Sequence, residues 1–239
     1  MSKGQSSMVL HCVSHLKFGS TDDVLTVGQR HKESSETKMI KSLFSVFPHG
    51  YTNKAGKVVP ASRPEGIWNV RKAYEYITSV KAKDETIALR ALHDKEGKRV
   101  FKAKNFITAT FGGVFEYRDA KSLSCQSGLM VLDVDNLKDE EEARHVQRMF
   151  IDDTRIESAL CFVSPSGCGV KSVVVIPERW RDMKYRDVFT EIRKYYLFEY
   201  GIEIDKSGSD ICRACYLPWD ENAYINDSLT IQKTYNYEY

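Results

Sequence analysis

The sequence lacks any long apolar run and any strong charge of one sign. A membrane-spanning helix needs roughly 18 consecutive apolar residues, and no segment of the 239-residue chain approaches that, so we expect no membrane contact. Lysine and arginine number 35 against 33 acidic residues, for a net charge of +2. A protein that holds nucleic acid by overall charge is strongly basic, so any basic surface must be local.

Cysteine is also scarce, and its six residues form neither a disulfide framework nor a set of zinc ligands. Cys212 and Cys215 form a C-x-x-C, but no second pair stands at zinc spacing, and we interpret both as core cysteines. The polar start MSKGQSS is followed by no apolar signal segment. These features predict a protein of the reducing cytoplasm.

The first hundred residues carry weak patterns. A strand is predicted at MVLHCVSHLKF, and a polar stretch follows it. Helical spacing begins at Ile67 and continues through Val70, Tyr74 and Ile77, and a second helix over 87–92 precedes the predicted turn HDKEGK. We predict a partly helical N-terminal extension, residues 1–100, packed on a core of residues 101–239.

Strands and helices alternate within that core. The predicted strands are NFITATFGGVF, GLMVLDVD, ESALCFV, VKSVVVI and ICRACYLPW, and the predicted helices run from about Lys138 to Phe150 and from about Met183 to Tyr200. From GLMVLDVD onward the order is strand, helix, strand, strand, helix, strand. This is the split β-α-β order of ferredoxin-like and RRM-like folds, so the predicted fold class is α+β.

The segment LMVLDVDNL ends an apolar strand with two acids. Because side chains alternate along a strand, Asp133 and Asp135 point to the same face. Two ionised carboxylates this close repel each other, and Mg²⁺ or Mn²⁺, which prefer oxygen ligands, would offset the repulsion. A structural alternative remains open, in which Asp133 ends the strand and Asp135 begins a turn.

The segment SPSGCGVK, residues 164–171, has the composition of a glycine-rich strand connection. Gly167 and Gly169 allow the backbone to approach a ligand, and successive amides can bind an anion. Lys171 adds a charge suited to phosphate. An ordinary hairpin turn has the same composition, so this alternative also remains open.

The segment IEIDKSGSDICRACYLPWD offers a third acid and an arginine. Asp205 is the first choice for the acid, and Asp210 is its competitor. Arg213 lies on the last predicted strand, where an unpaired cation is costly unless it meets an anion. Its structural alternative is a salt bridge to Asp220 or Glu203.

In this order, over about Asn105 to Asp220, the three features resemble the archaeo-eukaryotic primase superfamily, or primase-polymerases, especially the mobile-element and phage branch with VirE N-terminal-like domains. The family's D-x-D strand holds two metal ligands, its hairpin motif S-x-H contacts nucleotide phosphate, and a third acid completes the metal site. The resemblance implies that Asp133, Asp135 and Asp205 are catalytic and bind Mg²⁺ or Mn²⁺. It further implies a set of nucleotide-binding residues: Ser164, Ser166, Gly167, Gly169, Lys171 and Arg213.

The function implied is that of a DNA primase-like or polymerase-like nucleotidyltransferase in the replication of a mobile element or phage. Its partners would be a single-stranded DNA template, nucleoside triphosphates, and a helicase or other replication protein. Local basic and aromatic residues would contact the template: Arg179, Trp180, Arg181, Lys184, Tyr185 and Arg186. Lys171 stands where many relatives carry histidine, and no histidine follows His145.

Two other functions compete with this one. A catalytically inactive primase-like module that binds nucleic acid is favoured by the replacement of histidine with Lys171. A metal-dependent phosphatase of the haloacid-dehalogenase type also uses D-x-D, but that fold requires a parallel sheet and a later acidic pair.

Overall fold

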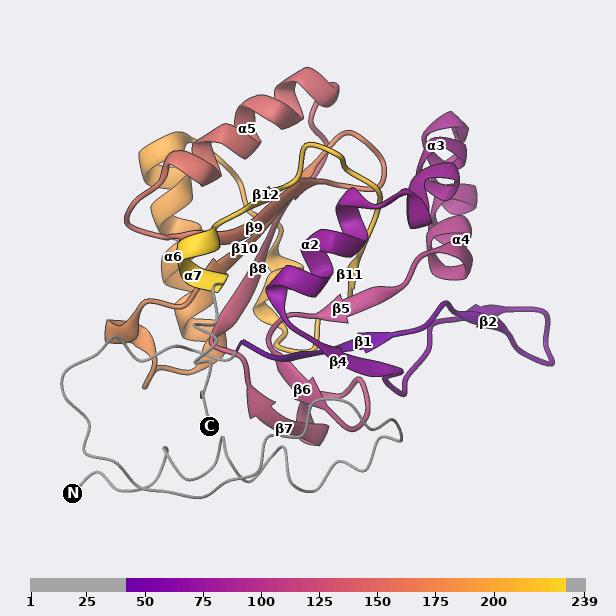
Figure 1. Ribbon diagram of the computed structural model, residues 1–239, viewed down its shortest axis with the longest axis horizontal. Helices are drawn as coiled ribbons and strands as arrows, with labels where there is room; N and C mark the ends of the chain where they lie inside the picture. Colours follow the sequence, from indigo (N-terminus) through magenta and orange to yellow (C-terminus); the bar gives the residue numbers. More distant parts are fainter. Residues whose placement is uncertain (1–41, 231–239) are drawn as a thin grey trace, which may run out of the picture. The chain divides into compact units, whose positions relative to one another are not determined.

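The computed structural model describes residues 42–230 (Figure 1). The first 41 residues of the predicted extension, including the predicted strand MVLHCVSHLKF, lie outside the described residues. The described part is a mixed α+β domain with antiparallel strands, as predicted at the level of fold class.

Two four-stranded antiparallel sheets form the body of the domain. The first, called the β5 sheet here, has the order β11-β5-β1-β4, with β11 at Cys215–Tyr216, β5 at Thr108–Thr110, β1 at Phe44–Phe47 and β4 at Gly66–Trp68. The second, the β8 sheet, has the order β12-β9-β10-β8, with β12 at Tyr224–Ile225, β9 at Ser158–Val163, β10 at Val170–Val175 and β8 at Leu129–Val134. Two short ribbons pair β2 (Tyr51–Thr52) with β3 (Val58–Val59) and β6 (Gly113–Phe115) with β7 (Leu123–Gln126).

Six α-helices accompany these sheets in residues 42–230: α2 Val70–Thr78, α3 Lys83–Ala91, α4 Lys95–Asn105, α5 Glu140–Asp152, α6 Tyr185–Tyr200 and α7 Asp227–Thr230. The single-turn 3₁₀ segments are η1 Val80–Ala82, η2 Ala120–Ser122, η3 Glu178–Trp180 and η4 Lys206–Ser209. Among these described helices none has the length and apolar character needed to cross a bilayer.

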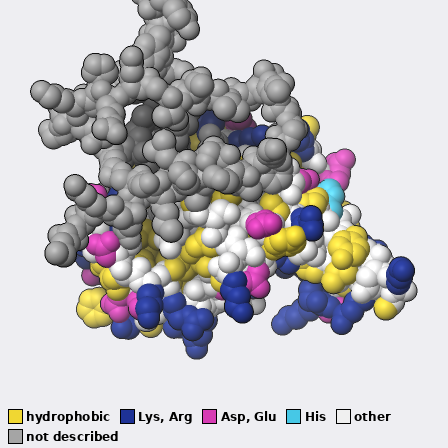
Figure 2. Space-filling model, turned by 90° about the horizontal axis from the view of Figure 1, so that it is seen from below, with side chains coloured by type: hydrophobic (Ala, Val, Ile, Leu, Met, Phe, Trp, Pro, Cys, Tyr) yellow, Lys and Arg dark blue, Asp and Glu magenta, His cyan; other side chains and the backbone are white. Residues whose placement is uncertain are grey.

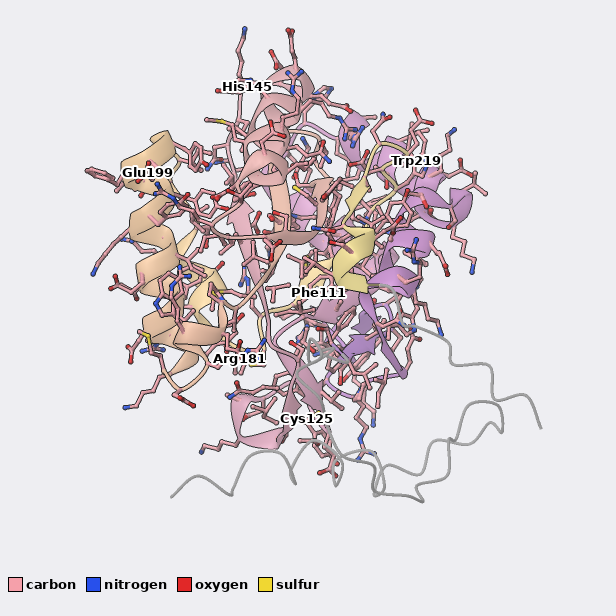
Figure 3. All side chains as sticks on the ribbon, turned by 60° about the vertical axis from the view of Figure 1, so that its left-hand side comes forward. Phe111, Cys125, His145, Arg181, Glu199 and Trp219 are labelled. Atoms are coloured by element: carbon pink, nitrogen blue, oxygen red, sulfur yellow. The ribbon has the colours of Figure 1, made fainter. Side chains whose placement is uncertain are left out.

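The β8 sheet has a different partner on each face, because its side chains alternate. Leu129 and Val131 share a buried cluster with Phe44 of the β5 sheet and with Phe111, which follows β5. Met130 lies in the other cluster, with side chains of α5 and α6. Figure 3 shows His145 of α5 and Glu199 of α6 at the periphery and Phe111 inside. Full burial of one such large apolar side chain contributes about 1.5–3 kcal/mol, so the packing holds the β8 sheet firmly from both sides.

The predicted split β-α-β order is present over β8, α5, β9, β10 and α6. Strand β10 lies between β8 and β9 and is antiparallel to both, which is the arrangement that this order produces. Helix α6 ends at Gly201, whose left-handed φ of 67° glycine adopts without strain, as predicted. The parallel sheet that the phosphatase alternative requires is not formed by the strands of either described sheet.

The predicted last strand is wrong in its length and in its partner. Within residues 211–219 only β11 is a strand, and it pairs with β5 rather than with the β8 sheet. The side chains of Asp205 and Asp210 each accept a hydrogen bond from the amide two residues later, so the chain coils through η4 and a turn first. The fourth strand of the β8 sheet is instead β12, on the outer edge of β9.

The predicted strand NFITATFGGVF is broken into β5 and β6. Gly112 lies in the turn between them, and a side chain there is excluded because its Cβ would lie 2.4 Å from the carbonyl oxygen of Ile211. After this turn β6 pairs with β7 instead of continuing the β5 sheet.

Two predictions in the N-terminal part are also wrong. Ile67 belongs to β4 and pairs with Ser45, and the helix begins only at Val70, because the Asn69 side chain caps it by accepting from the Lys72 amide. The segment HDKEGK is not a turn, since Asp94 caps the start of α4. The stretch before residue 101 therefore adds two strands to the β5 sheet as well as helices.

Candidate functional site

The first and third predicted acids lie side by side at the end of β8. Asp133 is buried, and its backbone oxygen accepts a hydrogen bond of 2.8 Å from the amide of Asp205, which immediately precedes η4. The competitor Asp210 is exposed, and its carboxylate is occupied by the amide and thiol of Cys212. The structure thus brings Asp205, rather than Asp210, to the D-x-D strand.

Lys171 forms a buried ion pair with Asp133. The two residues face each other across β10 and β8, and the lysine Nζ donates to Asp133 Oδ2. Their side chains are only 11% and 13% exposed. Burial alone would lower the pKa of Lys171. The pKa is nevertheless raised, mainly because the negative charge of Asp133 stabilises the ammonium. Lys171 is therefore charged, and it neutralises one of the two strand acids.

Asp133 also carries an unsatisfied oxygen. Its Oδ1 is buried and accepts no hydrogen bond from any described residue. A buried carboxylate oxygen without a partner is costly, so this atom has capacity for one more donor or for a cation.

The charge of Lys171 affects the pKa of both Asp135 and Asp205. Asp135 is exposed, but the neighbouring residues partly desolvate its carboxylate, and this desolvation is the main cause that raises its pKa. The negative charges of Asp133 and, to a smaller extent, Asp205 raise the pKa further. The pKa of Asp205 is lowered, first by its hydrogen bond with Ser207 and further by the positive charges of Arg213 and Lys171. The three acids are thus electrostatically coupled.

The glycine-rich segment is the hairpin turn between β9 and β10. We call residues 164–169 the Ser164–Gly169 turn. The amide of Ser164 donates to Gly169 O at 2.8 Å and the amide of Gly167 to Ser164 O at 3.0 Å, while the hydroxyls of Ser164 and Ser166 lie 3.1 Å apart. The amides of Ser164 and Gly167 therefore donate within the turn, and only the other amides of the turn and its hydroxyls are available to a ligand.

This turn presses on the end of β8 beside Asp135. A Cβ at Gly169 would lie 2.6 Å from the carbonyl oxygen of Val134 and 3.3 Å from Asp135 Oδ1. Only glycine allows so close an approach. Farther along, the amide of Leu137 donates to Cys168 O at 3.1 Å, so the turn and the segment after the D-x-D are held together.

Arg213 has none of the structural partners considered for it. Asp220 pairs with Arg144 at 2.7 Å and Glu203 with Arg193 at 3.2 Å. Arg213 lies in a turn before β11, not on a strand; it is exposed and forms no ion pair within residues 42–230. Its charge instead lowers the pKa of Asp205.

Lys102 is a cation that the sequence analysis missed. It lies in the last turn of α4, with its Nζ 5.8 Å from the centre of the Tyr216 ring. Its pKa is lowered by burial and by the nearby charges of Lys171 and Arg213, while Asp135 and Asp133 oppose that change. No motif marks this lysine in the sequence, because its position depends on the packing of α4 against β11.

We call these six residues the charged cluster: Lys102, Asp133, Asp135, Lys171, Asp205 and Arg213. The acids that it contains are the predicted metal ligands. Within residues 42–230, however, no three Asp, Glu, His or Cys side chains are grouped so that they could hold a metal ion as they stand. In this structure the negative charges of the acids are balanced by the positive charges of Lys171 and Arg213.

The residues predicted to contact a template belong to a separate segment that follows β10, but Tyr185 of this segment hydrogen-bonds to the backbone of Val131, two residues before Asp133. They occupy η3 and the start of α6, which follow the far end of β10 from Lys171. Arg181 forms an ion pair with Glu178, and the Cζ atom of Arg179 lies 4.6 Å from the centre of the Trp180 ring. Arg179 and Trp180 line a cavity of about 520 Å³ beside α6. Figure 3 shows Arg181 well separated from Trp219, which packs in a small cluster with Phe106 and Tyr216.

Basic side chains are dispersed over the visible surface. Figure 2 shows Lys and Arg in separate groups, interrupted by apolar and acidic side chains, on the part of the face that is not grey. This agrees with the near balance of charges in the sequence.

The described residues thus define an α+β domain with a cluster of opposite charges at the end of a split β-α-β sheet. The family model described as BT4734-like, N-terminal domain, matches residues 101–225, just over half of the chain, and the chain belongs to this family. No curated protein and no solved structure matches the chain. All six residues of the charged cluster fall within the matched segment.

Proposed function

We propose that this domain binds a nucleoside triphosphate and acts as a nucleotidyltransferase of the primase-polymerase type. It would add nucleotides on a single-stranded DNA template, in the replication of a mobile element or phage. The observation that carries the proposal is the hydrogen bond from the Asp205 amide to Asp133 O, because it joins a third acid to the D-x-D strand. Cations suited to phosphate lie in the same cluster.

A divalent cation fits the charged cluster in the chemistry of its donors. Asp133, Asp135 and Asp205 offer oxygen ligands of the kind Mg²⁺ and Mn²⁺ prefer, and the buried Asp133 Oδ1 has no other partner. Because Lys171 already holds Asp133 Oδ2, cation binding requires these side chains to rearrange. A bound pair of cations would activate an attacking hydroxyl and stabilise the leaving pyrophosphate.

The chain's own cations would hold the triphosphate. Arg213 is exposed and unpaired within residues 42–230, so its guanidinium is available to phosphate oxygens. Lys171 would exchange part of its interaction with Asp133 for one with phosphate. Ser164 and Ser166 carry hydroxyls in the turn that leads into the strand of Lys171. Arg213, Lys171 and the two serines would thus orient the nucleotide without contributing to bond making directly.

A second function is favoured by one observation. The Lys171 ammonium neutralises Asp133 and stands where a cation would otherwise bind. A domain in which that pair is permanent would bind nucleic acid or nucleotide without catalysis. The two functions differ in whether product forms.

The test is incorporation of labelled deoxynucleotides or ribonucleotides on a single-stranded template, with Mg²⁺ or Mn²⁺. The wild type is compared with the double variant Asp133→Ala plus Asp135→Ala, and Asp182→Ala, an exposed acid that precedes α6, serves as the control. We expect product from the wild type and the control only. No product from the wild type with either metal contradicts nucleotidyl transfer, and template and nucleotide binding then test the second function.

A further inference from the structure

Arg90, in the last turn of α3, packs on the Ser164–Gly169 turn. A Cβ built on Gly167 would lie 3.4 Å from Arg90 Nε and 3.7 Å from Cζ. Gly167 has a φ of +83°, the left-handed region that glycine adopts without strain. The guanidinium therefore lies directly against the backbone of the predicted nucleotide-binding turn.

Only part of this guanidinium has a partner. Arg90 Nη1 donates to Glu140 Oε2 at 3.1 Å, at the start of α5. Its Nε is buried and has no acceptor among the described residues. An N–H group left without an acceptor in a buried position is costly, and the planar guanidinium suits two-point binding of phosphate.

The turn connects Arg90 to the charged cluster. At one position it contacts Arg90 through Gly167, and two residues later Gly169 lies against Asp135. The paired hydroxyls of Ser164 and Ser166 belong to the same turn, and Ser164 Oγ would lie 3.0 Å from a Cβ built on Gly169. An anion seated on this turn would therefore meet the Arg90 guanidinium at Gly167.

We infer that Arg90 is a further phosphate-binding residue, which contacts the phosphates of a nucleoside triphosphate held at the Ser164–Gly169 turn. The identity of this ligand rests on the proposed function. Arg90 lies before residue 101, outside the segment that the family model matches. The N-terminal part of the domain thus contributes directly to the nucleotide site.

A purely structural role makes a different prediction. If Arg90 only joins α3 to α5 through Glu140, loss of either partner breaks this pair and neither variant strengthens phosphate binding, although Glu140→Gln also removes the ion pair between Glu140 and Arg144. If Arg90 binds phosphate, Arg90→Gln removes the ligand contact, whereas Glu140→Gln removes its competitor and leaves the guanidinium free. Arg90→Gln then weakens phosphate binding, whereas Glu140→Gln leaves it unchanged or strengthens it.

The experiment measures binding of inorganic tripolyphosphate and of a deoxynucleoside triphosphate by isothermal titration calorimetry at low ionic strength. We expect Arg90→Gln to weaken both about tenfold, the effect typical of one charge-assisted contact. Glu140→Gln is expected to bind as tightly as the wild type or more tightly. Arg71→Gln, which also breaks a pair between two elements, with Asp227, is the control and is expected to leave affinity unchanged. Thermal melting confirms that each variant is folded.

Equal losses in Arg90→Gln and Glu140→Gln would overturn the inference, and so would a wild type that binds neither ligand. Binding that depends on Arg90 in a protein that incorporates no nucleotide supports the inference and contradicts only the nucleotidyl transfer. The two proposals therefore fail separately.

Discussion

Lys171 and Asp133 face each other on neighbouring strands, and each is the main counter-charge of the other in a buried position. The pair explains how Asp133 can be buried in an apolar strand without a bound cation, while Asp135, just past the end of the strand, is exposed. It also means that the acids and the lysine of the site are one electrostatic unit, so a change in one alters the others.

Replacing Lys171 with methionine is expected to lower the free energy of unfolding by about 3–5 kcal/mol, because Asp133 is then left as an uncompensated buried charge. Urea denaturation measures this change. The double variant Lys171→Met plus Asp133→Leu is expected to recover much of the loss. If the single variant is as stable as the wild type, the ion pair is not formed in solution.

Asp135→Asn is expected to raise the free energy of unfolding at neutral pH. The pKa of Asp135 is raised in the folded protein above its ordinary value of 3.8, so ionising it costs more in the folded state than in the unfolded one. That cost is fully present above the raised pKa and absent below 3.8, where both states hold the proton. The advantage of the variant is therefore expected to vanish as the pH falls, which urea denaturation at several pH values tests. An advantage that does not change with pH would contradict this cause.

Mg²⁺ or Mn²⁺ is expected to raise the melting temperature of the wild type, because a ligand that binds only the folded state stabilises it by mass action, about 2.7 kcal/mol at a hundred times the dissociation constant. Asp133→Ala plus Asp135→Ala is expected to lose this response, and Asp182→Ala to keep it. An equal response in all three proteins would place the cation elsewhere.

Lys102→Met is expected to leave stability unchanged or slightly increased, since burial and two neighbouring cations already disfavour the charged lysine. If the cluster holds a triphosphate, the same variant weakens its binding. Lys104→Met, exposed at the end of the same helix, is the matched control. Calorimetry with tripolyphosphate separates the two variants, and equal affinities would remove Lys102 from the site.

Local patterns predicted the parts of the structure that depend on neighbours in sequence. The strand alternation expected along LMVLDVD is present in β8, where Leu129 and Val131 lie in one cluster and Met130 in the other, and apolar spacing located α5 and α6 within a few residues. The pairing of β11 with β5 was missed, because side-chain capping by Asp205 and Asp210 shortens the strand and distant packing selects its partner.

The residues of the site also divide into those that a local pattern predicts and those that depend on distant packing. Asp133 follows from a strand pattern, and Asp135 comes directly after the end of that strand, at Val134. Lys102 and Arg90, in contrast, reach the site only through the packing of α4 and α3, which no local motif encodes. The choice of Asp205 over Asp210 likewise required the backbone hydrogen bond to Asp133.

The pairing of β1 with β5 sets a lower limit on the folding unit. In a fragment that begins at residue 101, β5 would lose its neighbour between residues 108 and 110, and the Ser45 hydroxyl would no longer bridge to the backbone of Phe115. The freed edge would present unpaired backbone groups beside the uncovered ring of Phe111, a combination that promotes aggregation. Recombinant fragments intended to retain the fold therefore need to include the residues from β1 onward.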